Sequence, residues 1–197
     1  WLYADVSVFY LKYNDRIGSA FARDSNFMTY RLRTNVSDSR NRGLEFLLEG
    51  DILKAISEGR SKYKLGVYTN LSLIDARYVN TTNTAIANKL VENVPPVLFR
   101  TGISTGTPRW NVSWQLSYQS KQYSDATNTE ITPTAIDGAI PAFTVMDLSI
   151  SYNWRKYAIY TGINNLTDTK YFTRRADGYP GPGIIPADIR NYYITLS

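Results

Sequence analysis

The chain of 197 residues has the length of a single domain, and its composition already excludes several chemistries. It contains no cysteine and no histidine, so disulfide frameworks, Cys/His zinc sites and serine–histidine hydrolase sites are excluded. The net charge is +5, from 22 Lys and Arg against 17 Asp and Glu, and the basic residues are scattered. This balance favours anionic partners without indicating nucleic acid.

Both ends of the sequence have the pattern of β-strands. Trp1 opens one alternating segment and Ser197 closes another, and neither an initiator methionine nor a signal peptide is present. We therefore expect a piece of a longer polypeptide. No apolar run approaches the roughly 18 residues of a membrane helix, which excludes a helical membrane protein but not a barrel.

Alternation of apolar and polar residues predicts eight β-strands. The clearest example is 110–119, where apolar and aromatic side chains from Trp110 to Tyr118 alternate with Asn, Ser and Gln. Pro95 and Pro96 cannot donate to a strand ladder, so they mark the start of a strand. One short helical turn is predicted at 52–58. The predicted strands are 2–10, 40–49, 63–73, 97–106, 110–119, 143–154, 156–165 and 188–197.

The predicted connections alternate between long and short. The long polar ones are 15–38, 76–95, 120–141 and 172–187, and the shorter ones are 51–61, 107–109 and 154–156. This alternation is typical of a transmembrane β-barrel, with long loops outside and short turns in the periplasm. The strands that begin near residues 1, 62, 109 and 156 should then run outward.

A soluble β-sandwich shows the same alternation, but two features favour a barrel. Aromatic residues lie at strand ends on the apolar face, and the opposite face is polar and mostly uncharged, as in a wet lumen. The residues predicted to face lipid are Trp110, Trp114, Leu116, Leu148, Ile150 and Leu196. Those predicted to face the lumen are Asn111, Gln115, Ser149 and Asn153.

Several motifs resemble one family in order and spacing. Residues 163–172, Ile-Asn-Asn-Leu-Thr-Asp-Thr-Lys-Tyr-Phe, resemble the "N-N-L-x-D-x-x-Y" penultimate strand of TonB-dependent outer-membrane receptors. Arg42-Gly43-Leu44-Glu45 resembles the family's "R-x-x-G-x-E" strand, and Asn93-Val94-Pro95-Pro96 its "N-x-P" strand entry. The run from Tyr179 to Pro186 most resembles the ferric dicitrate transporters.

This resemblance implies an all-β fold: an antiparallel transmembrane β-barrel segment, about the last eight strands of a 22-stranded barrel. Residues 1–197 would form the C-terminal part of the barrel, without the plug domain and earlier strands. The implied function is TonB-dependent import of a ferric dicitrate-like chelate or siderophore across the Gram-negative outer membrane. The implied partners are that ligand, TonB through an N-terminal box, and outer-membrane lipid and lipopolysaccharide, with a monomeric complete receptor. No cofactor, metal site or enzymatic activity is implied.

The candidate ligand-binding residues are Arg174, Arg175, Asp177 and Tyr179, in the loop 173–186. An arginine guanidinium can donate two hydrogen bonds to the two oxygens of one carboxylate, so this loop could hold a ferric citrate-like anion at the extracellular mouth. The alternative is a stiff loop whose arginines contact lipopolysaccharide phosphates or neighbouring loops. Asp147 faces the lumen in this register, where we expect it to pair with an Arg or Lys.

A second basic set lies in the predicted loop 15–38. Its arginines are interleaved with aromatic residues, a composition that also occurs in nucleic-acid-binding proteins. They are few and lie in an exposed connection, so we interpret them as a solvated loop. The set consists of Arg23, Arg31 and Arg33 with Phe21, Phe27 and Tyr30.

A second function remains open at this stage: a small closed eight-stranded outer-membrane barrel with a structural or adhesion role. Eight strands can close on themselves. Such a lumen must be filled by side chains, whereas the neutral polar faces here suit a wider curve. Direct pairing of residues 2–10 with 190–197 would support the small barrel. A hydrolase would lack a histidine base.

Overall fold

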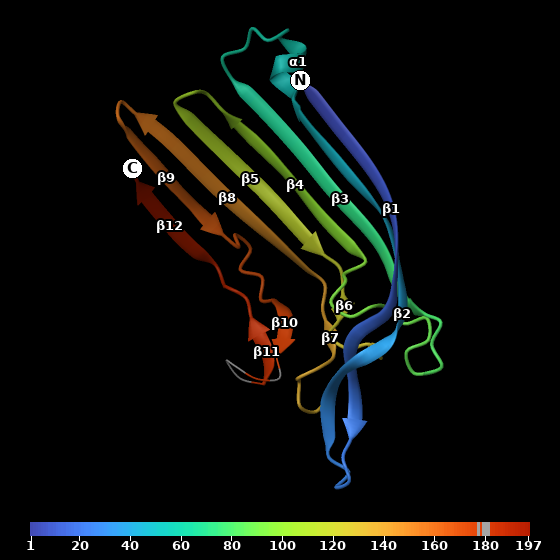
Figure 1. Ribbon diagram of the computed structural model, residues 1–197. Helices are drawn as coiled ribbons and strands as arrows, with labels where there is room; N and C mark the ends of the chain where they lie inside the picture. Colours follow the sequence, from blue (N-terminus) through green and yellow to red (C-terminus); the bar gives the residue numbers. More distant parts are fainter. Residues whose placement is uncertain (177, 179–181) are drawn as a thin grey trace.

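The computed structural model describes residues 1–176, 178 and 182–197, and only the backbone at 19–21, 23, 29 and 31. These residues form a curved antiparallel sheet of eight strands, with two short hairpins in its connections (Figure 1). The eight strands, in their order across the sheet, are β1 (Leu2–Arg23), β2 (Thr29–Asp51), β3 (Lys64–Val79), β4 (Val97–Gly106), β5 (Trp110–Gln119), β8 (Phe143–Trp154), β9 (Tyr157–Asn164) and β12 (Asn191–Leu196).

Each of the eight predicted strands is present, which confirms the reading of the alternation. The predicted helical turn is α1 (Ile52–Ile56), and the carboxylate of Asp51 caps it by accepting from the backbone amide of Lys54 at 2.9 Å. Strand β4 begins at Val97, directly after Pro96, as expected for residues without a donor.

The prediction of a long loop at 15–38 was wrong. Strands β1 and β2 continue through this segment, and only residues 24–28 form the turn between them. A β-bulge between Tyr13 and Arg16 interrupts their pairing, with Asp15 at a φ of 52°. The sequence beyond the bulge does not alternate apolar and polar residues, so no pattern marks the strands although their backbones still pair.

The connections at 120–141 and 172–187 also contain regular structure. The first holds the hairpin of β6 (Gln122–Tyr123) and β7 (Ala139–Ile140), and the second the hairpin of β10 (Phe172–Ala176) and β11 (Gly183–Pro186). Strands of two to five residues leave too little sequence for a period of two to be detected.

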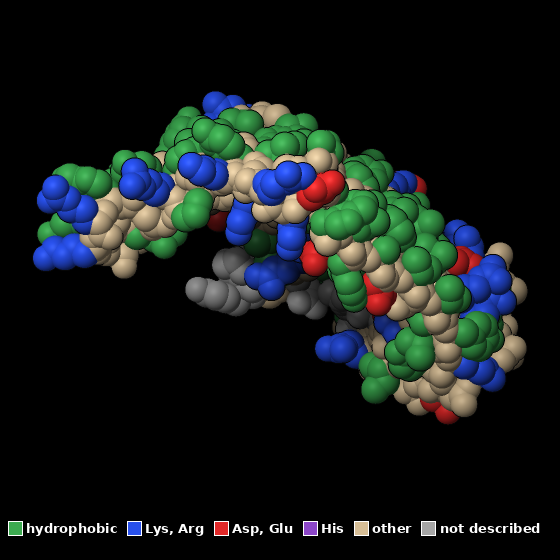
Figure 2. Space-filling model, turned by 90° about the horizontal axis from the view of Figure 1, so that it is seen from above, with side chains coloured by type: hydrophobic (Ala, Val, Ile, Leu, Met, Phe, Trp, Pro, Cys, Tyr) green, Lys and Arg blue, Asp and Glu red, His purple; other side chains and the backbone are tan. Residues whose placement is uncertain are grey.

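The register confirms the predicted separation of the two faces. Trp114 of β5 pairs with Leu148 of β8, while Gln115 pairs with Asp147 on the other side of the sheet. Figure 2 looks along the strands: hydrophobic side chains cover much of the convex face, and charged side chains project into the hollow side. The convex face is the apolar one, and the concave face is polar.

Short turns and long connections lie at opposite ends of the sheet (Figure 1). We call these the turn end, with α1 and the turns at 107–109 and 155–156, and the loop end. Strands β1, β3, β5 and β9 run from the turn end to the loop end, as predicted. Among the described residues, no helix is long and apolar enough to span a membrane.

The sheet is open, with β1 at one edge and β12 at the other. Within the described part of the chain these two strands do not pair with each other. The alternative of a small closed eight-stranded barrel is therefore wrong for this structure. Since backbone groups facing lipid need hydrogen-bond partners, these edges require further strands in a membrane.

The hydrophobic core lies at the loop end, on the concave side. Tyr78 at the end of β3 is fully buried, and the connections at 80–96 and 120–142 supply residues that pack around it. Segment 88–91 adds to the sheet beside β3, because the amide of Tyr78 donates to Lys89 at 3.0 Å and that of Val91 to Ala76 at 3.1 Å. The core residues are Ala76, Tyr78, Ile86, Val91 and Ala126.

Candidate functional site

Polar side chains form rows across the concave face. Residues paired in register share a face, so one row runs from Glu49 through Tyr68 and Gln115 to Asp147. The hydroxyl of Tyr68 donates to the side-chain oxygen of Gln115 at 2.7 Å, spanning the strand between them. This face therefore presents hydrogen-bonding groups to whatever occupies the hollow.

Glycines on this face make room for aromatic rings from the neighbouring strand. A Cβ at Gly102 would lie 2.5 Å from the ring of Tyr68, its partner in the register. Gly162 faces Tyr193 in the same way, where a Cβ would lie 2.7 Å from the hydroxyl oxygen. Each ring therefore packs over a glycine of the neighbouring strand.

A hollow of about 590 Å³ lies over the middle strands on the concave side. Its charged lining residues are Glu45 of β2 and Arg100 of β4, and its remaining lining is polar and aromatic apart from two leucines, Leu47 and Leu98. Arg100 is exposed and lies in the row of Asn70 and Ser117. The prediction of a mostly uncharged lumen omitted both charges.

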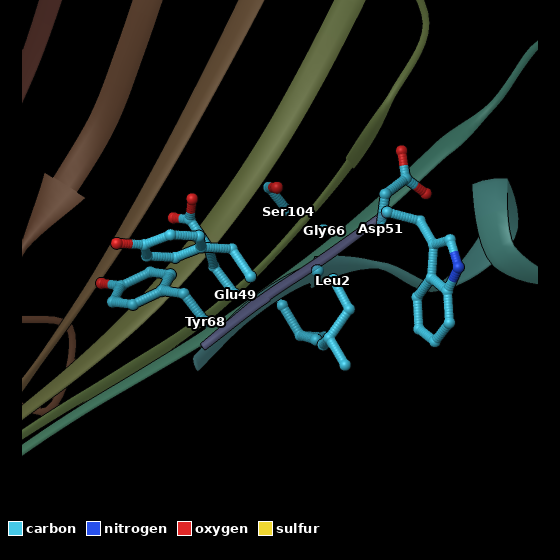
Figure 3. Close-up of a pocket in the computed structure, with 10 residues that line it drawn as sticks. Leu2, Glu49, Asp51, Gly66, Tyr68 and Ser104 are labelled. Carbon is cyan, nitrogen blue, oxygen red and sulfur yellow. The ribbon is translucent and has the colours of Figure 1, made fainter. Parts of the chain in front are cut away.

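A second hollow, of about 420 Å³, lies at the turn end beside β1. Tyr68 and Glu49 lie together on one side of it, and Asp51 lies on the other (Figure 3). Gly66 and Ser104 also line it. Asp51 caps α1, so its carboxylate already has a structural partner.

The Asn-Asn-Leu motif organises the junction of β8, β9 and the connection to β12. Asn165 is 3% exposed. Its side-chain amide donates to the carbonyl of Thr169 and accepts from the backbone amide of Thr169, each at 2.8 Å, and it also donates to the carbonyl of Asp188 at 3.3 Å. Its own backbone amide donates to Asp147 at 2.9 Å. The expected partner of Asp147, an Arg or Lys, is thus replaced by a backbone amide. The motif has a structural role here.

The core at the loop end also contains a buried polar pair. The hydroxyl of Tyr78 donates to the carboxylate of Glu92, and both residues are buried. Gly18 of β1 packs against this pair, since a Cβ there would lie 2.8 Å from Glu92 and 3.0 Å from the hydroxyl oxygen. The pair ties the connection 80–96 to the concave side of the sheet.

An ion pair stabilises the connection 120–142. The ammonium of Lys121 lies 2.6 Å and 2.7 Å from the two carboxylate oxygens of Glu130, and the hydroxyl of Tyr123 donates to the same carboxylate at 2.9 Å. These hydrogen bonds lower the pKa of Glu130 and raise that of Lys121. Both groups are exposed, so the ion pair adds little to the free energy of unfolding and mainly holds the connection in position.

The two candidate arginines have different surroundings. Arg174 is exposed on β10, at the loop end. Arg175 donates to the carbonyls of Ala135 at 2.8 Å and Ala139 at 2.7 Å, and its guanidinium lies 5.1 Å from the ring centre of Phe172. Arg175 thus joins the hairpin β10–β11 to the connection 120–142. Asp177 and Tyr179 lie outside the described residues.

The second basic set lies on the hairpin of β1 and β2 instead of a loop. Arg33, Phe27 and Tyr30 are exposed, and the side chains of the other members lie outside the described part of the structure. Among the residues that are described, no group of three or more Asp, Glu, His or Cys side chains could hold a metal ion. The described structure thus presents a polar concave face and two arginines, Arg174 and Arg175, on the hairpin β10–β11.

The fold and its two faces define the class of protein: a segment of a transmembrane β-barrel with an apolar outside and a polar inside. Residues 1–166 match the family described as "TonB dependent receptor-like, beta-barrel". The chain therefore belongs to the TonB-dependent receptor family. Members of this family are transporters and receptors of the Gram-negative outer membrane and are not enzymes.

Solved structures of several receptors have the same fold. The ferric citrate transporter FecA aligns over 99% of this chain and 28% of its own, at 21% identity and a TM-score of 0.78. The copper transporter OprC aligns over 99% and 28%, at 16% identity and 0.71. The ferric yersiniabactin uptake receptor FyuA from Yersinia pestis aligns over 99% and 27%, at 13% identity and 0.71. The chain thus spans little more than a quarter of these receptors. No curated protein matched in a sequence comparison.

Proposed function

We propose that this chain is the C-terminal part of the barrel of a receptor that imports a ferric chelate across the outer membrane. The whole protein would add the plug domain and the earlier strands, draw energy from TonB through an N-terminal box, and act as a monomer. The observation that carries this proposal is the family membership, combined with a curved sheet whose two edges, β1 and β12, need further strands.

The chemistry of the segment favours a chelated hard metal as cargo. The chain has no histidine or cysteine and two methionines, so it offers almost no soft ligands of the kind that bind bare copper. Its concave face carries hydroxyl, amide and carboxylate groups with Arg100 among them. Such groups suit a polar anionic chelate, as in the ferric citrate transporter FecA, better than a free copper ion.

Within this proposal Arg174 is the residue that meets the chelate. It is exposed at the loop end, and the contacts of Arg175 with Ala135 and Ala139 hold its hairpin in place. A carboxylate-rich chelate could then accept hydrogen bonds from the Arg174 guanidinium in pairs. Arg175 would hold the hairpin that carries Arg174. Asp177 and Tyr179 would complete the set of ligand-binding residues.

Binding of ferric dicitrate to the full-length receptor tests this assignment. Arg174→Ala should raise the dissociation constant about tenfold or more, equivalent to about 1.4 kcal/mol. Arg155→Ala, at the turn end, is the matched control. This variant should leave both the binding of the chelate and growth on it under iron limitation unchanged.

Three outcomes would contradict parts of the proposal. Unchanged binding in Arg174→Ala would leave the hairpin as a stiff element that contacts lipopolysaccharide or other loops. Binding of a siderophore in place of citrate would correct the cargo while retaining the import function. Failure of every ferric chelate to bind or to support growth would overturn iron import itself.

A further inference from the structure

The net charge of the chain is concentrated at the turn end. The connection 51–64 and the turns 107–109 and 155–156 carry seven Lys and Arg side chains against two carboxylates, Asp51 and Glu58. Removing these from the totals of 22 and 17 leaves 15 of each sign, so the rest of the chain is neutral. The seven basic side chains are all exposed, and we call them the turn-end cations: Lys54, Arg60, Lys62, Lys64, Arg109, Arg155 and Lys156.

Both carboxylates at the turn end already have partners. Asp51 caps α1 by accepting from the backbone amide of Lys54 at 2.9 Å, and Glu58 pairs with Arg60. Within the part of the chain that the structure describes, no carboxylate forms an ion pair with the other six turn-end cations. Their positive field is therefore not compensated by these residues, and it favours an anionic partner.

Two of the turn-end cations lie over aromatic rings at the border of the convex face. Trp154 and Tyr157 pair in register and continue the alternation of the convex face in β8 and β9. The guanidinium carbon of Arg155 lies 5.6 Å from the ring centre of Trp154, and Nζ of Lys156 lies 5.4 Å from that of Tyr157. These contacts hold both charges beside the apolar convex face instead of the concave one.

An apolar hollow of about 470 Å³ adjoins the same two rings. Trp154 and Tyr157 line it together with Ile159 of β9 and with Leu196 and Ser197 at the end of the chain. The two rings thus contact an apolar hollow as well as two positive charges. A ligand that matches this arrangement has an apolar chain that ends in an anionic group. Phosphate suits the anionic end, because a guanidinium donates to its oxygens in pairs.

The connection that contains α1 repeats this combination of apolar and basic side chains. Ile52 and Ile56 lie four residues apart and therefore on one side of the short helix, and they are 39% and 76% exposed. Lys54, Arg60 and Lys62 belong to the same connection. Figure 1 places α1 at the same end of the sheet as the turn between β8 and β9. Exposed apolar side chains next to basic ones are typical of elements at a membrane surface.

We propose that the turn end binds anionic glycerophospholipids of the periplasmic leaflet of the outer membrane. An acyl chain lies along the hollow at Trp154 and Tyr157, and the phosphate accepts hydrogen bonds from Arg155 and Lys156. The short turns of an outer-membrane barrel face the periplasm, so the lipid at this end is a phospholipid and not lipopolysaccharide. Each further basic side chain near an anionic membrane surface strengthens the attraction. The proposal rests on the outer-membrane location, and its failure would leave chelate import untouched.

The test uses the full-length receptor in detergent, with bound lipid counted by native mass spectrometry. The probes are phosphatidylglycerol, phosphatidylethanolamine with the same acyl chains, and free glycerophosphate. We expect phosphatidylglycerol to bind about tenfold more tightly than the zwitterionic phosphatidylethanolamine. Glycerophosphate should not compete, because it lacks the acyl chains that contact the hollow.

Paired variants locate the site. Arg155→Gln with Lys156→Gln should reduce the preference for phosphatidylglycerol to about twofold or less, because it removes both charges beside the hollow. The matched control, Arg33→Gln with Lys89→Gln, removes two exposed cations at the loop end and should retain the preference. Arg155→Lys keeps the charge and should retain it too. Heat-dependent gel mobility verifies that each variant has assembled.

Four results would overturn the proposal. They are equal binding of the two phospholipids to the unaltered receptor, an undiminished preference in the assembled Arg155→Gln with Lys156→Gln variant, competition by glycerophosphate, and binding of purified peptidoglycan in place of phospholipid. If the paired variant does not assemble, the ionic strength decides. The preference of the unaltered receptor should fall severalfold between about 50 and about 500 mM salt, and a constant preference would contradict the proposal.

Discussion

At the scale of single residues, the polar positions that resembled functional motifs have mainly structural roles. Asn165 closes the turn after β9, Asp147 accepts its backbone amide, and Arg175 joins two connections at the loop end. Each is a buried or half-buried group whose hydrogen bonds replace those lost to water. Arg174 differs, because its side chain is exposed.

Asn165→Ala should destabilise the barrel, since it removes three side-chain hydrogen bonds and leaves backbone groups of Thr169 without partners. We expect a loss of about 1–3 kcal/mol, visible as a lower midpoint of heat-dependent gel mobility in the full-length receptor. The matched control is Asn164→Ala, whose exposed side chain donates to Asn191 at 2.8 Å. Equal midpoints for the two variants would refute the structural role of Asn165.

At the scale of the strands, the sheet separates two environments by alternate residues. In β5 the side chain of Trp114 points to the convex face and that of Ser113 to the concave face, where it pairs with serines on both sides. The concave face also carries the charges Glu45 and Arg100. A shift of one residue in the register would place these groups against lipid, so the register is strongly determined.

An arginine at Trp114 should therefore cost far more than one at Ser113, although the two residues are adjacent. Trp114 lies near the middle of β5, where a charge facing lipid costs about 2–4 kcal/mol. We expect Trp114→Arg to reduce assembly in the outer membrane and Ser113→Arg to assemble normally, as measured by the heat-modifiable band in membrane fractions. Normal assembly and heat stability of Trp114→Arg would show that this face does not contact lipid.

The strands could be predicted from the sequence only where apolar and polar residues alternate. Segments that cross the apolar band, such as 110–119, carry the full alternation and were located almost to the residue. The segment 15–38 was misjudged because its sequence does not alternate apolar and polar residues, although its two strands still pair. The same alternation places Arg40 and Arg42 on the face of Leu44, as the register confirms.

At the scale of the whole molecule, the open sheet determines what the chain can be. Its strands follow chain order from β1 to β12, and the two edge strands remain separate in the described structure. A curved sheet of this kind buries its edges only as part of a larger barrel. The concave hollow would then lie inside that barrel.

Cysteine cross-linking in the full-length receptor tests this arrangement, and the described chain offers a background without cysteine. Leu48→Cys with Thr69→Cys joins partners of β2 and β3 in the register and should oxidise to a disulfide. Val6→Cys with Ile194→Cys joins the two edges and should remain reduced, because disulfides need Cα atoms within about 7 Å. Efficient cross-linking of the second pair in intact membranes would restore the small closed barrel.

The sequence alone determined the eight strands of the large sheet, their direction, the two faces and the family, because these follow from local alternation, from the lengths of the connections and from short motifs. Only the tertiary structure decided the extension of β1 and β2 through 15–38, the partners of Asp147 and Arg175, and the core around Tyr78. Each of these depends on residues far apart in sequence, such as Arg175 with Ala135 and Ala139. The physical reason is that alternation reports the environment of each face, whereas hydrogen bonds and ion pairs depend on which strands and connections meet in space.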